Sequence, residues 1–343
     1  MNRTFRETFA RNCNPARAAA VAGGILLCLF FAPAAFAQPL PSWNQSAAKQ
    51  AIIDFVTRVT SEGSSEFVPP AERIAVFDND GTLWAEKPVP FQFLFALDEI
   101  RRMAPEHPEW NNEEPFKSVL NGDLKILAGM GKKAMAQIMA TTHAGMTTDA
   151  FAQSVSNWIT SAEHPQRHVP YTKLVYQPQL ELLDYLRAHG FKTFIVSGGG
   201  VEFMRVFAKE VYGIPPEQVI GSSGKVEYRY GSGGEPELIK QPQMEFVDDG
   251  PGKPVGINRF IGHRPLMAIG NSDGDLQMIE YTMAGEGPRL AVYIRHDDAE
   301  REYSYDRADR LAKLDKGLDE AQAKGWPVVS MKKDWTVIFP ASQ

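Results

Sequence analysis

The fold of this 343-residue chain is decided by one stretch, Arg73-Ile-Ala-Val-Phe-Asp78-Asn-Asp80-Gly-Thr-Leu-Trp84. In it, a short apolar, β-branched run ends in two aspartates that stand two positions apart, and a glycine and a threonine follow at once. Side chains alternate along a strand, so Asp78 and Asp80 would share one face if strand geometry continued, and Gly81 then lets the chain turn away. Two buried acids repel each other, and burial makes their ionisation costly. A fold tolerates such a pair mainly when a cation or a reaction needs it; the alternative is an Asp-Gly turn after a strand.

The sequence Asp-x-Asp-Gly-Thr after a hydrophobic strand resembles the first motif of the haloacid dehalogenase (HAD) superfamily. Most members of that superfamily are phosphatases with an aspartate nucleophile. The resemblance implies that Asp78 is the nucleophile, that Asp80 is the general acid and base, and that Thr82 helps to bind phosphate. An acid at the position of Asp80 marks phosphatases and phosphomutases, whereas dehalogenases and P-type ATPases lack it.

A second window, Phe194-Ile-Val-Ser197-Gly-Gly-Gly200, places a hydroxyl and three glycines at the end of a predicted strand, with a predicted helix after them. Glycines let backbone N–H groups approach an anion closely, and a helix N-terminus favours negative charge. The window resembles the second HAD motif, which implies that Ser197, Gly198 and Gly199 bind the transferring phosphoryl group. The alternative is a Gly-rich turn without a ligand.

The third window, Gly252-Lys253-Pro-Val-Gly-Ile-Asn-Arg-Phe, opens a predicted short helix just before the next strand. The superfamily has a lysine there that offsets charge near the phosphate, so the resemblance implies this role for Lys253. Lys225 and Lys240 are rivals on a predicted β-hairpin, and most lysines are simply solvated.

The fourth window, Gly270-Asn271-Ser-Asp273-Gly-Asp275, resembles the Gly-Asp-x-x-x-Asp acidic motif but has an amide where the first acid, a magnesium ligand, would stand. An amide carbonyl can coordinate a hard cation, but it supplies no charge. We therefore expect Mg²⁺, or another divalent cation, with weakened affinity or looser metal preference. The alternative is a surface turn before a helix. The ligand candidates are the carboxylates and the amide of these windows: Asp78, Asp80, Asn271, Asp273 and Asp275.

Beyond these windows, strands and helices alternate, which predicts an α/β fold with a doubly wound, parallel (Rossmann-like) sheet. Ligands of such sheets bind at the carboxyl ends of the strands. Apolar stripes between 91 and 163 predict helices between the first and second catalytic strands. We expect a core of residues 38–85 and 171–343 and a helical cap of residues 86–170, an arrangement that resembles the phosphoserine phosphatase-like branch.

A cap of this size implies a small organic phosphate ester as substrate. Trp84 and Glu86 lie nearest the first motif, although the serine-binding glutamate of phosphoserine phosphatases does not align cleanly with Glu86. Exposed cations and single histidines are more often surface or structural residues. The other candidate substrate contacts are Lys87, Arg101, Arg102, His143, His164, Arg167 and His168.

The N-terminus has the pattern of a secretory signal peptide over residues 1–37: a basic start, an apolar run and Ala35-Phe36-Ala37 before Gln38. The alternative is an uncleaved anchor, because 18–37 carries no charge. Cleavage predicts a periplasmic or secreted protein without stable membrane association. The mature chain would have no cysteine, 32 basic and 41 acidic residues and a net charge of −9, so we expect no nucleic-acid partner.

Together these features predict a metal-dependent phosphomonoester hydrolase. Two other classes stay open: a phosphotransferase that uses an alcohol acceptor, and a non-catalytic phosphate-binding protein in which Asn271 marks lost activity. The pattern leaves the oligomeric state open and gives no function to residues 295–343.

Overall fold

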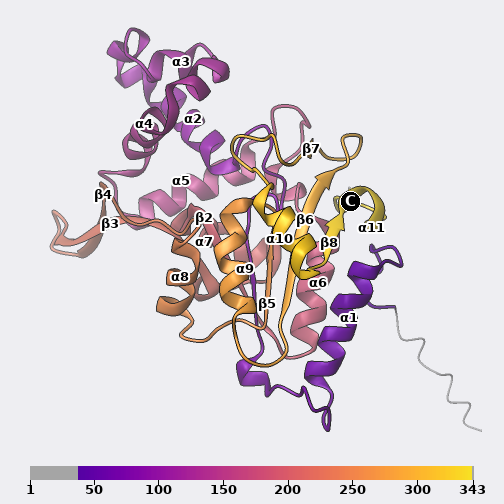
Figure 1. Cartoon of the computed structure of the whole chain (residues 1–343). Coiled ribbons are helices and arrows are strands. Elements are labelled where there is room, and N and C mark those ends of the chain that lie inside the picture. The colour runs from indigo at the N-terminus through magenta and orange to yellow at the C-terminus, as the bar shows by residue number, and fades with distance from the viewer. Residues whose placement is uncertain (1–37, 342–343) are drawn as a thin grey trace, which may run out of the picture. The chain divides into compact units, whose positions relative to one another are not determined.

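The computed structural model of the chain describes residues 38–341, apart from the side chains at positions 124, 128 and 132. The predicted signal peptide lies outside these residues. Within them, eight strands form one sheet in the order β4-β3-β2-β1-β5-β6-β7, with β8 paired to β6 (Figure 1). The central pairs are parallel, and only the β3–β4 and β6–β7 pairs of the described sheet are antiparallel. The predicted α/β fold with a doubly wound parallel core is confirmed.

The strands have these bounds: β1 Ile74–Phe77, β2 Lys192–Gly200, β3 Val219–Tyr230, β4 Pro236–Phe246, β5 Met267–Gly270, β6 Leu290–Asp297, β7 Ser304–Tyr305 and β8 Val328–Ser330. The helices that cover the sheet are α1 Ala47–Thr60, α6 Gln177–Ala188, α7 Val201–Tyr212, α8 Gly252–Phe260, α9 Leu276–Met283, α10 Lys316–Lys324 and the short α11 Met331–Asp334.

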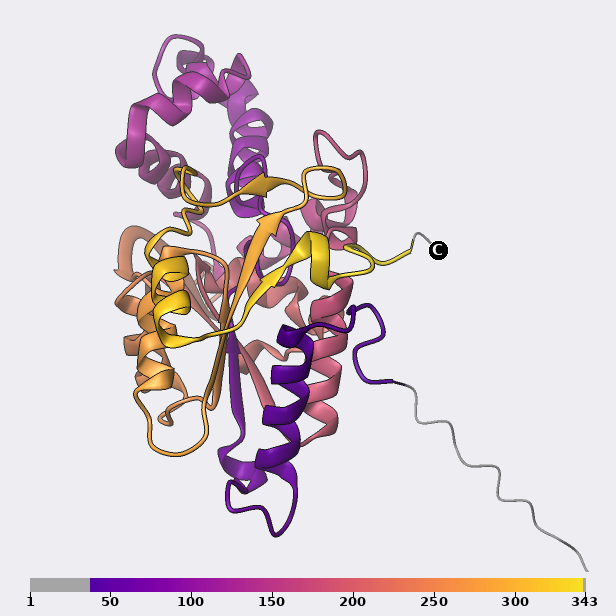
Figure 2. The ribbon, with the colours of Figure 1, turned by 45° about the vertical axis from the view of Figure 1, so that its right-hand side comes forward.

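Strand β1 is buried on both faces, which explains its uninterrupted apolar sequence. Ala75 and Phe77 belong to the hydrophobic cluster that also contains side chains of α1, α6 and α7. Ile74 and Val76 point the other way and pack with side chains of α8, α9 and α10. Figure 2 shows these two groups of helices on opposite faces of the sheet.

The segment between β1 and β2 is helical, as its apolar stripes predict. Its helices are α2 Phe91–Met103, α3 Phe116–Leu120, α4 Leu124–His143 and α5 Thr148–Ser161, with a break in α4 at Gly131. We call residues 86–170 the insert. Helices α2, α3 and α4 stand beyond the carboxyl ends of the strands (Figures 1 and 2).

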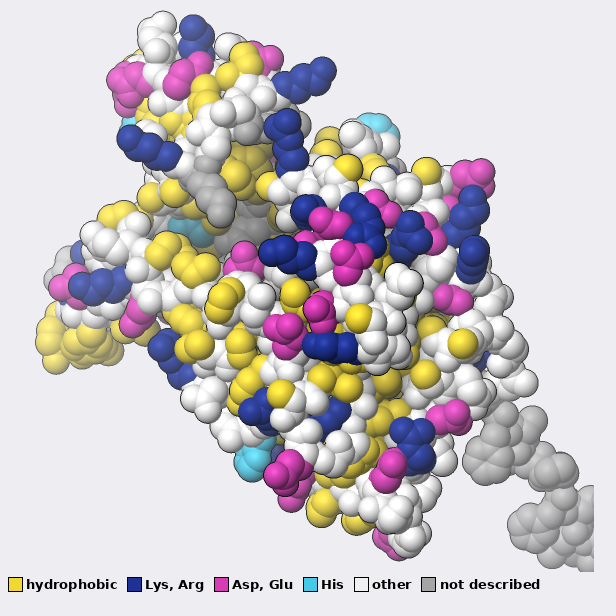
Figure 3. Space-filling model, viewed as in Figure 1, with side chains coloured by type: hydrophobic (Ala, Val, Ile, Leu, Met, Phe, Trp, Pro, Cys, Tyr) yellow, Lys and Arg dark blue, Asp and Glu magenta, His cyan; other side chains and the backbone are white. Residues whose placement is uncertain are grey.

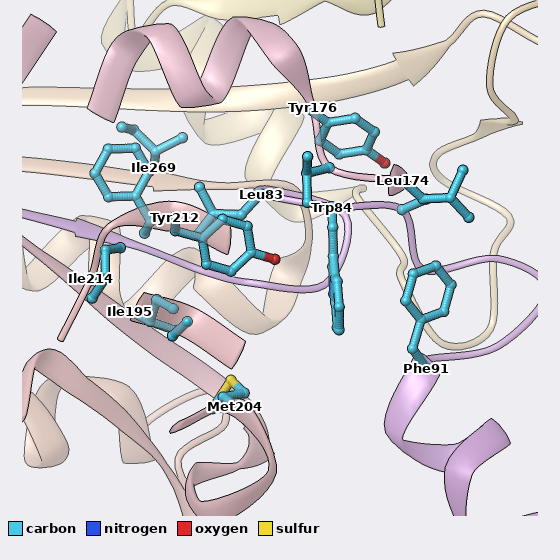
Figure 4. Packing of buried hydrophobic residues seen from close by; sticks show 14 of the residues in the cluster. Leu83, Trp84, Phe91, Leu174, Tyr176, Ile195, Met204, Tyr212, Ile214 and Ile269 are labelled. Carbon is cyan, nitrogen blue, oxygen red and sulfur yellow. The ribbon is translucent and has the colours of Figure 1, made fainter. Parts of the chain in front are cut away.

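The insert is not separate from the hydrophobic core. The ring centroids of Phe95 on α2 and Phe203 on α7 lie 5.7 Å apart, and Trp158 on α5 lies 6.2 Å from Phe203. Figure 4 shows Phe91 of the insert beside Trp84 within the same buried cluster. The β3–β4 hairpin, which the sequence predicts, also holds the insert, since Lys240 N donates to Met146 O. One end of the insert is therefore anchored to the sheet, while α3 and α4 reach outward.

In the part of the chain that the structure describes, no helix has the length and apolar character needed to cross a membrane.

Candidate active site

The two aspartates of the first motif stand where β1 ends. The Asp78 N–H still pairs with Ile269 O of β5 at 3.0 Å, and then the chain turns, with three successive N–H groups (residues 82–84) directed at Asn79 O. Gly81 makes this turn with φ of +77°, and a Cβ there would overlap the Asn271 amide and the Glu86 carboxylate. Glycine is therefore required at this position by both its φ angle and the space around it.

Lys253, in the first turn of α8, lies directly against the predicted nucleophile. Its Nζ lies 2.7 Å from Asp78 Oδ1, 2.6 Å from Asp275 Oδ1 and 2.9 Å from Val196 O, and only 2% of the residue is exposed. Burial lowers the pKa of the Lys253 ammonium, but the two carboxylates outweigh burial and raise it overall. The rival Lys240 instead pairs with Glu202 on α7. Of the two, only Lys253 lies beside Asp78.

Burial perturbs both aspartates of the motif. Desolvation and the neighbouring Asp275 raise the pKa of Asp78 above its usual range, against the opposite influence of Lys253. Desolvation raises the pKa of Asp80 to about 6, even though Trp84 Nε1 donates to Asp80 Oδ1 at 2.7 Å. Asp80 can therefore hold a proton at mildly acidic pH and release it near neutrality, which suits an acid and base.

The glycine-rich window forms a cradle beside these acids, at the junction of β2 and α7. A Cβ built on Gly199 would lie 3.5 Å from both Asp80 Oδ2 and Ser197 Oγ, so all three meet in one small volume. The Gly200 N–H donates to Gln92 Oε1 at 2.7 Å. Gln92 comes from the first turn of α2, so the insert reaches the cradle through this side chain. The only sequence signal for Gln92 is a polar residue inside an apolar helix stripe.

Both carboxylates of the acidic turn already have hydrogen-bond partners within the protein. Asp275 Oδ2 accepts the N–H groups of Asn271 and Ser272 at 2.9 and 3.0 Å, while its Oδ1 accepts from Lys253. Asp273 Oδ1 accepts the N–H groups of residues 315 and 317 at 3.0 and 2.9 Å. These carboxylates thus serve the backbone and the lysine, and we leave Asp273 and Asp275 out of the ligand set proposed below.

Asn271 is held at both ends of its amide. Thr82 Oγ1 donates to Asn271 Oδ1 at 3.0 Å, and Asn271 Nδ2 donates to Glu86 Oε1 at 2.8 Å. Thr82 is fully buried, and its role in phosphate binding stays a prediction. Burial raises the pKa of Glu86 well above its ordinary value.

The donors that remain suit a hard cation by their chemistry. Among the described residues, no group of three or more His, Cys, Asp and Glu side chains is gathered as a metal site. Two carboxylates and one amide oxygen are nevertheless available from Asp78, Asp80 and Asn271, and Mg²⁺ prefers such oxygen ligands. Three acids, Asp78, Asp80 and Asp275, lie near the buried Lys253, which pairs directly with Asp78 and Asp275, and a divalent cation would offset this excess of acids.

Several expected substrate contacts are instead structural. Trp84 is fully buried and stacks on Phe207 at 4.6 Å, within the cluster of Figure 4. His164 is also buried and bonds Lys87 O at 2.6 Å. Arg167 donates to the backbone carbonyls of residues 301 and 302.

The other cations of the insert lie away from the cradle. Arg101 and Arg102 pair with Asp98 and Glu99 on their own helix. Lys87 forms an ion pair with Asp309 at 2.6 Å. His168 is exposed in a loop, with φ of 53°. Nothing in this geometry brings these side chains toward Asp78.

His143 is the exception, because it lines a cavity that opens beside the cradle. The cavity has a volume of about 360 Å³ between the insert and the β3–β4 hairpin, where Figure 3 shows the surface hollowed. Its walls include Gln92, His143, Phe151, Gly198, Gly200 and Lys240. Burial lowers the pKa of His143 to about 3, and Lys240 adds to this shift, so the imidazole is neutral. Gln92 Nε2 lies 3.2 Å from His143 Nε2 and links the cavity wall to the cradle.

The C-terminal segment supports the catalytic turn, a role that the sequence did not indicate. His296 Nε2 lies 2.8 Å from Gly81 O, and its Nδ1 lies 3.0 Å from Glu302 Oε2. The Tyr305 hydroxyl donates to Glu86 Oε1 at 2.7 Å, and its ring stacks on His296 at 4.2 Å. These residues follow no local motif, so only the fold reveals that they meet the turn.

Comparison with known proteins places this geometry in a family. Among solved structures, a functionally unknown protein from Anaerococcus prevotii DSM 20548 has a TM-score of 0.50 and 14% identity, over 87% of this chain and 96% of its own. A protein of unknown function from Bordetella pertussis Tohama I has a TM-score of 0.47 and 16% identity, over 75% and 98%. A phosphoserine phosphohydrolase-like protein from Francisella tularensis subsp. tularensis SCHU S4 has a TM-score of 0.34 and 18% identity, over 65% and 88%.

The similarity to the protein from Anaerococcus prevotii, at 14% identity, concerns the fold alone. No curated protein matches the chain in sequence. The model of the haloacid dehalogenase-like hydrolases matches residues 75–280, which include all four windows of the site. Since this match covers more than half of the sequence, the chain belongs to the haloacid dehalogenase-like hydrolase family.

Proposed function

We propose that this hydrolase is a magnesium-dependent phosphatase that cleaves small organic phosphate monoesters through an aspartyl-phosphate. The observation that carries the proposal is the 2.7 Å contact between Lys253 Nζ and Asp78 Oδ1, beside a second acid and a glycine cradle. A carboxylate nucleophile, a cation against it and backbone donors next to it are the parts that phosphoryl transfer needs.

In the first step, an Asp78 oxygen attacks phosphorus, and the bond to the ester oxygen breaks. Asp80 donates its proton to that oxygen, so the product leaves as an alcohol. In the second step, Asp80 takes a proton from water, and the hydroxide oxygen attacks the aspartyl-phosphate. Inorganic phosphate then leaves, and Asp78 is free again.

The charge on the phosphoryl oxygens needs fixed partners in both steps. Lys253 supplies a buried positive charge, and Ser197 with the amides of Gly198 and Gly199 supplies neutral donors. A bound Mg²⁺, held by Asp78, Asp80 and Asn271, would add positive charge at the same oxygens and favour the ionised nucleophile.

The cavity beside the cradle supports a substrate of limited size. We propose that the insert closes the site as a cap and that the leaving group lies between Gln92 and the apolar wall near Phe151. A volume of about 360 Å³ suits a small organic group.

The test is hydrolysis of p-nitrophenyl phosphate with and without Mg²⁺, for the wild type and Asp78→Asn. Acid-quenched wild-type enzyme should carry hydroxylamine-labile phosphate, and Asp78→Asn should carry none. Added glycerol tests the transferase alternative, because a transferase would form glycerol phosphate. Equal inactivity of both proteins across metals and pH would refute the proposal.

We also propose export of the protein, on the signal-like sequence of residues 1–37 alone. Expression of the full chain in a Gram-negative host, followed by N-terminal sequencing of the periplasmic fraction, should give a mature N-terminus at Gln38. Retention of the full-length chain in the membrane fraction would contradict this.

A further inference from the structure

The contact between Asn271 and Glu86 lies directly over the catalytic turn. The Asn271 Nδ2 and Glu86 Oε1 atoms meet at 2.8 Å, in the space that a Cβ of Gly81 would occupy. Gly81 follows Asp80 immediately, so this amide–carboxylate pair is in contact with the loop that carries both predicted catalytic acids. Glu86 is 6% exposed and Asn271 is 2% exposed.

The partners of this pair determine which end of the amide is oxygen. A carboxylate accepts hydrogen bonds, so the Asn271 nitrogen faces Glu86, and the oxygen then faces the Thr82 hydroxyl. An amide oxygen has two lone pairs, and Thr82 uses only one. The second stays available to a cation. Without an acceptor at position 86, nothing would keep the amide from turning its nitrogen toward the site.

Glu86 is itself fixed from outside the region that matches the family model. The Tyr305 hydroxyl donates to Glu86 Oε1 at 2.7 Å. The His296 ring stacks on the Tyr305 ring, and Lys87 Nζ lies 4.0 Å from the centroid of the Tyr305 ring. Lys87 pairs with Asp309, so it does not neutralise Glu86 by a direct ion pair. The Glu86 side chain is thus buried and oriented by two neutral donors, Asn271 and Tyr305, while Lys87 acts on it only through its charge.

We propose that Glu86 is a positioning residue of the cation site, which accepts from the Asn271 nitrogen and so holds the Asn271 amide with its oxygen available as a ligand. The inference rests on the proposed metal-dependent function, and it gives Glu86 a role other than the substrate contact expected from its sequence position.

The experiment measures Mg²⁺ binding to the substrate-free protein by titration calorimetry, for the wild type, Glu86→Gln, Tyr305→Phe and the exchanged pair Glu86→Gln/Asn271→Asp. Loss of an outer partner typically weakens metal binding by about 10- to 100-fold, so we expect at least tenfold for Glu86→Gln. Tyr305→Phe removes only a hydroxyl, and we expect Mg²⁺ binding to weaken by about two- to fivefold. The exchanged pair has a carboxylate at position 271, which presents an oxygen in either orientation, so its Mg²⁺ affinity should return to within about threefold of the wild type.

Glu99→Gln is the matched control, because Glu99 is also a buried carboxylate (5% exposed) but pairs with Arg102 on α2. Its Mg²⁺ affinity should equal that of the wild type. Wild-type affinity in folded Glu86→Gln overturns the inference, as does an exchanged pair that binds no better than Glu86→Gln. If Glu86→Gln does not fold, the Mg²⁺ affinities of Tyr305→Phe and of the exchanged pair test the inference instead. If the wild type binds no divalent cation, the metal-dependent function is overturned as well. If Mg²⁺ affinity is the same whichever residue stands at position 86, only this inference is overturned.

Discussion

The two sides of the active site are built differently. On the sheet side, Lys253 donates to both Asp78 and Asp275 within 2.7 Å, and Asp275 also accepts from the backbone of its own turn. On the insert side, the cavity has largely apolar walls, and its few polar groups, such as His143 and Lys240, each have one or two partners.

This difference indicates a division of labour. Charges that move in the reaction need partners fixed in advance, and a sheet edge fixes them. The choice of leaving group needs only shape and a few polar contacts, which helices of an insert can vary without disturbing the sheet. Substitutions on the sheet side should therefore affect catalysis and folding strongly, and those on the insert side should have smaller effects.

The largest loss of activity is expected on the sheet side, at the proposed nucleophile Asp78. Asp78→Asn should lower kcat/KM for p-nitrophenyl phosphate by at least about 10⁴-fold, which corresponds to about 5.5 kcal/mol of transition-state stabilisation. Asp184→Asn, an exposed aspartate on α6, should leave the rate unchanged. Residual activity above a hundredth of the wild type in Asp78→Asn would mean that another group attacks phosphorus.

Two buried lysines, Lys253 on the sheet side and Lys240 on the hairpin, test the comparison directly. Lys253→Met leaves Asp78 and Asp275 buried without their shared cation, and we expect the free energy of unfolding to fall by about 3–5 kcal/mol. Lys240→Met on the hairpin removes a pair with Glu202, whose side chain is 25% exposed, and about 1–2 kcal/mol is expected there. Urea denaturation at pH 7 measures both. Equal losses in the free energy of unfolding would show that the sheet-side network stabilises the fold no more than the Lys240–Glu202 pair does.

Much of this site could be predicted from sequence because each part lies at the end of a strand. The windows around Asp78, Ser197, Lys253 and Asn271 are local patterns, and parallel strands bring their carboxyl ends to one edge. Strand-helix alternation likewise predicted the α/β class, since a doubly buried strand such as β1 leaves a continuous apolar run.

What the sequence could not give are the pairings between distant segments. Glu86 and Tyr305 are separated by 219 positions, and nothing near Tyr305 marks it as a partner of the turn. Asp273 fits a metal-ligand pattern by spacing, yet the backbone N–H groups of the segment after Lys313 occupy one of its oxygens. Spacing identifies residue types that can bind a cation, but the competing donors become visible only in three dimensions.

His143 provides a pH-dependent test of the insert side. Its pKa is lowered to about 3 in the folded protein and returns to about 6.5 on unfolding, so the unfolded state binds more protons between these values. Stability should therefore be lost as pH falls below about 6.5, by at most about 1.4 kcal/mol per pH unit from this group. His143→Gln should show a shallower loss between pH 6.5 and 4.5 in thermal unfolding. Parallel curves for the two proteins would mean that the imidazole is already charged when folded.

The smallest effect on stability and Mg²⁺ affinity is expected at Asp273, which can be compared with Asn271 on the same side of the site. Asp273→Asn keeps an oxygen for the N–H groups of residues 315 and 317 but loses the charge, so we expect stability to fall by about 1 kcal/mol or less. Mg²⁺ affinity should stay within about threefold of the wild type if Asp273 is no ligand, whereas Asn271→Ala should lower it by about tenfold or more. Calorimetric titration of the two variants side by side separates these outcomes. A larger loss of Mg²⁺ affinity in Asp273→Asn than in Asn271→Ala would return Asp273 to the ligand set and assign to Asn271 only the support of the turn.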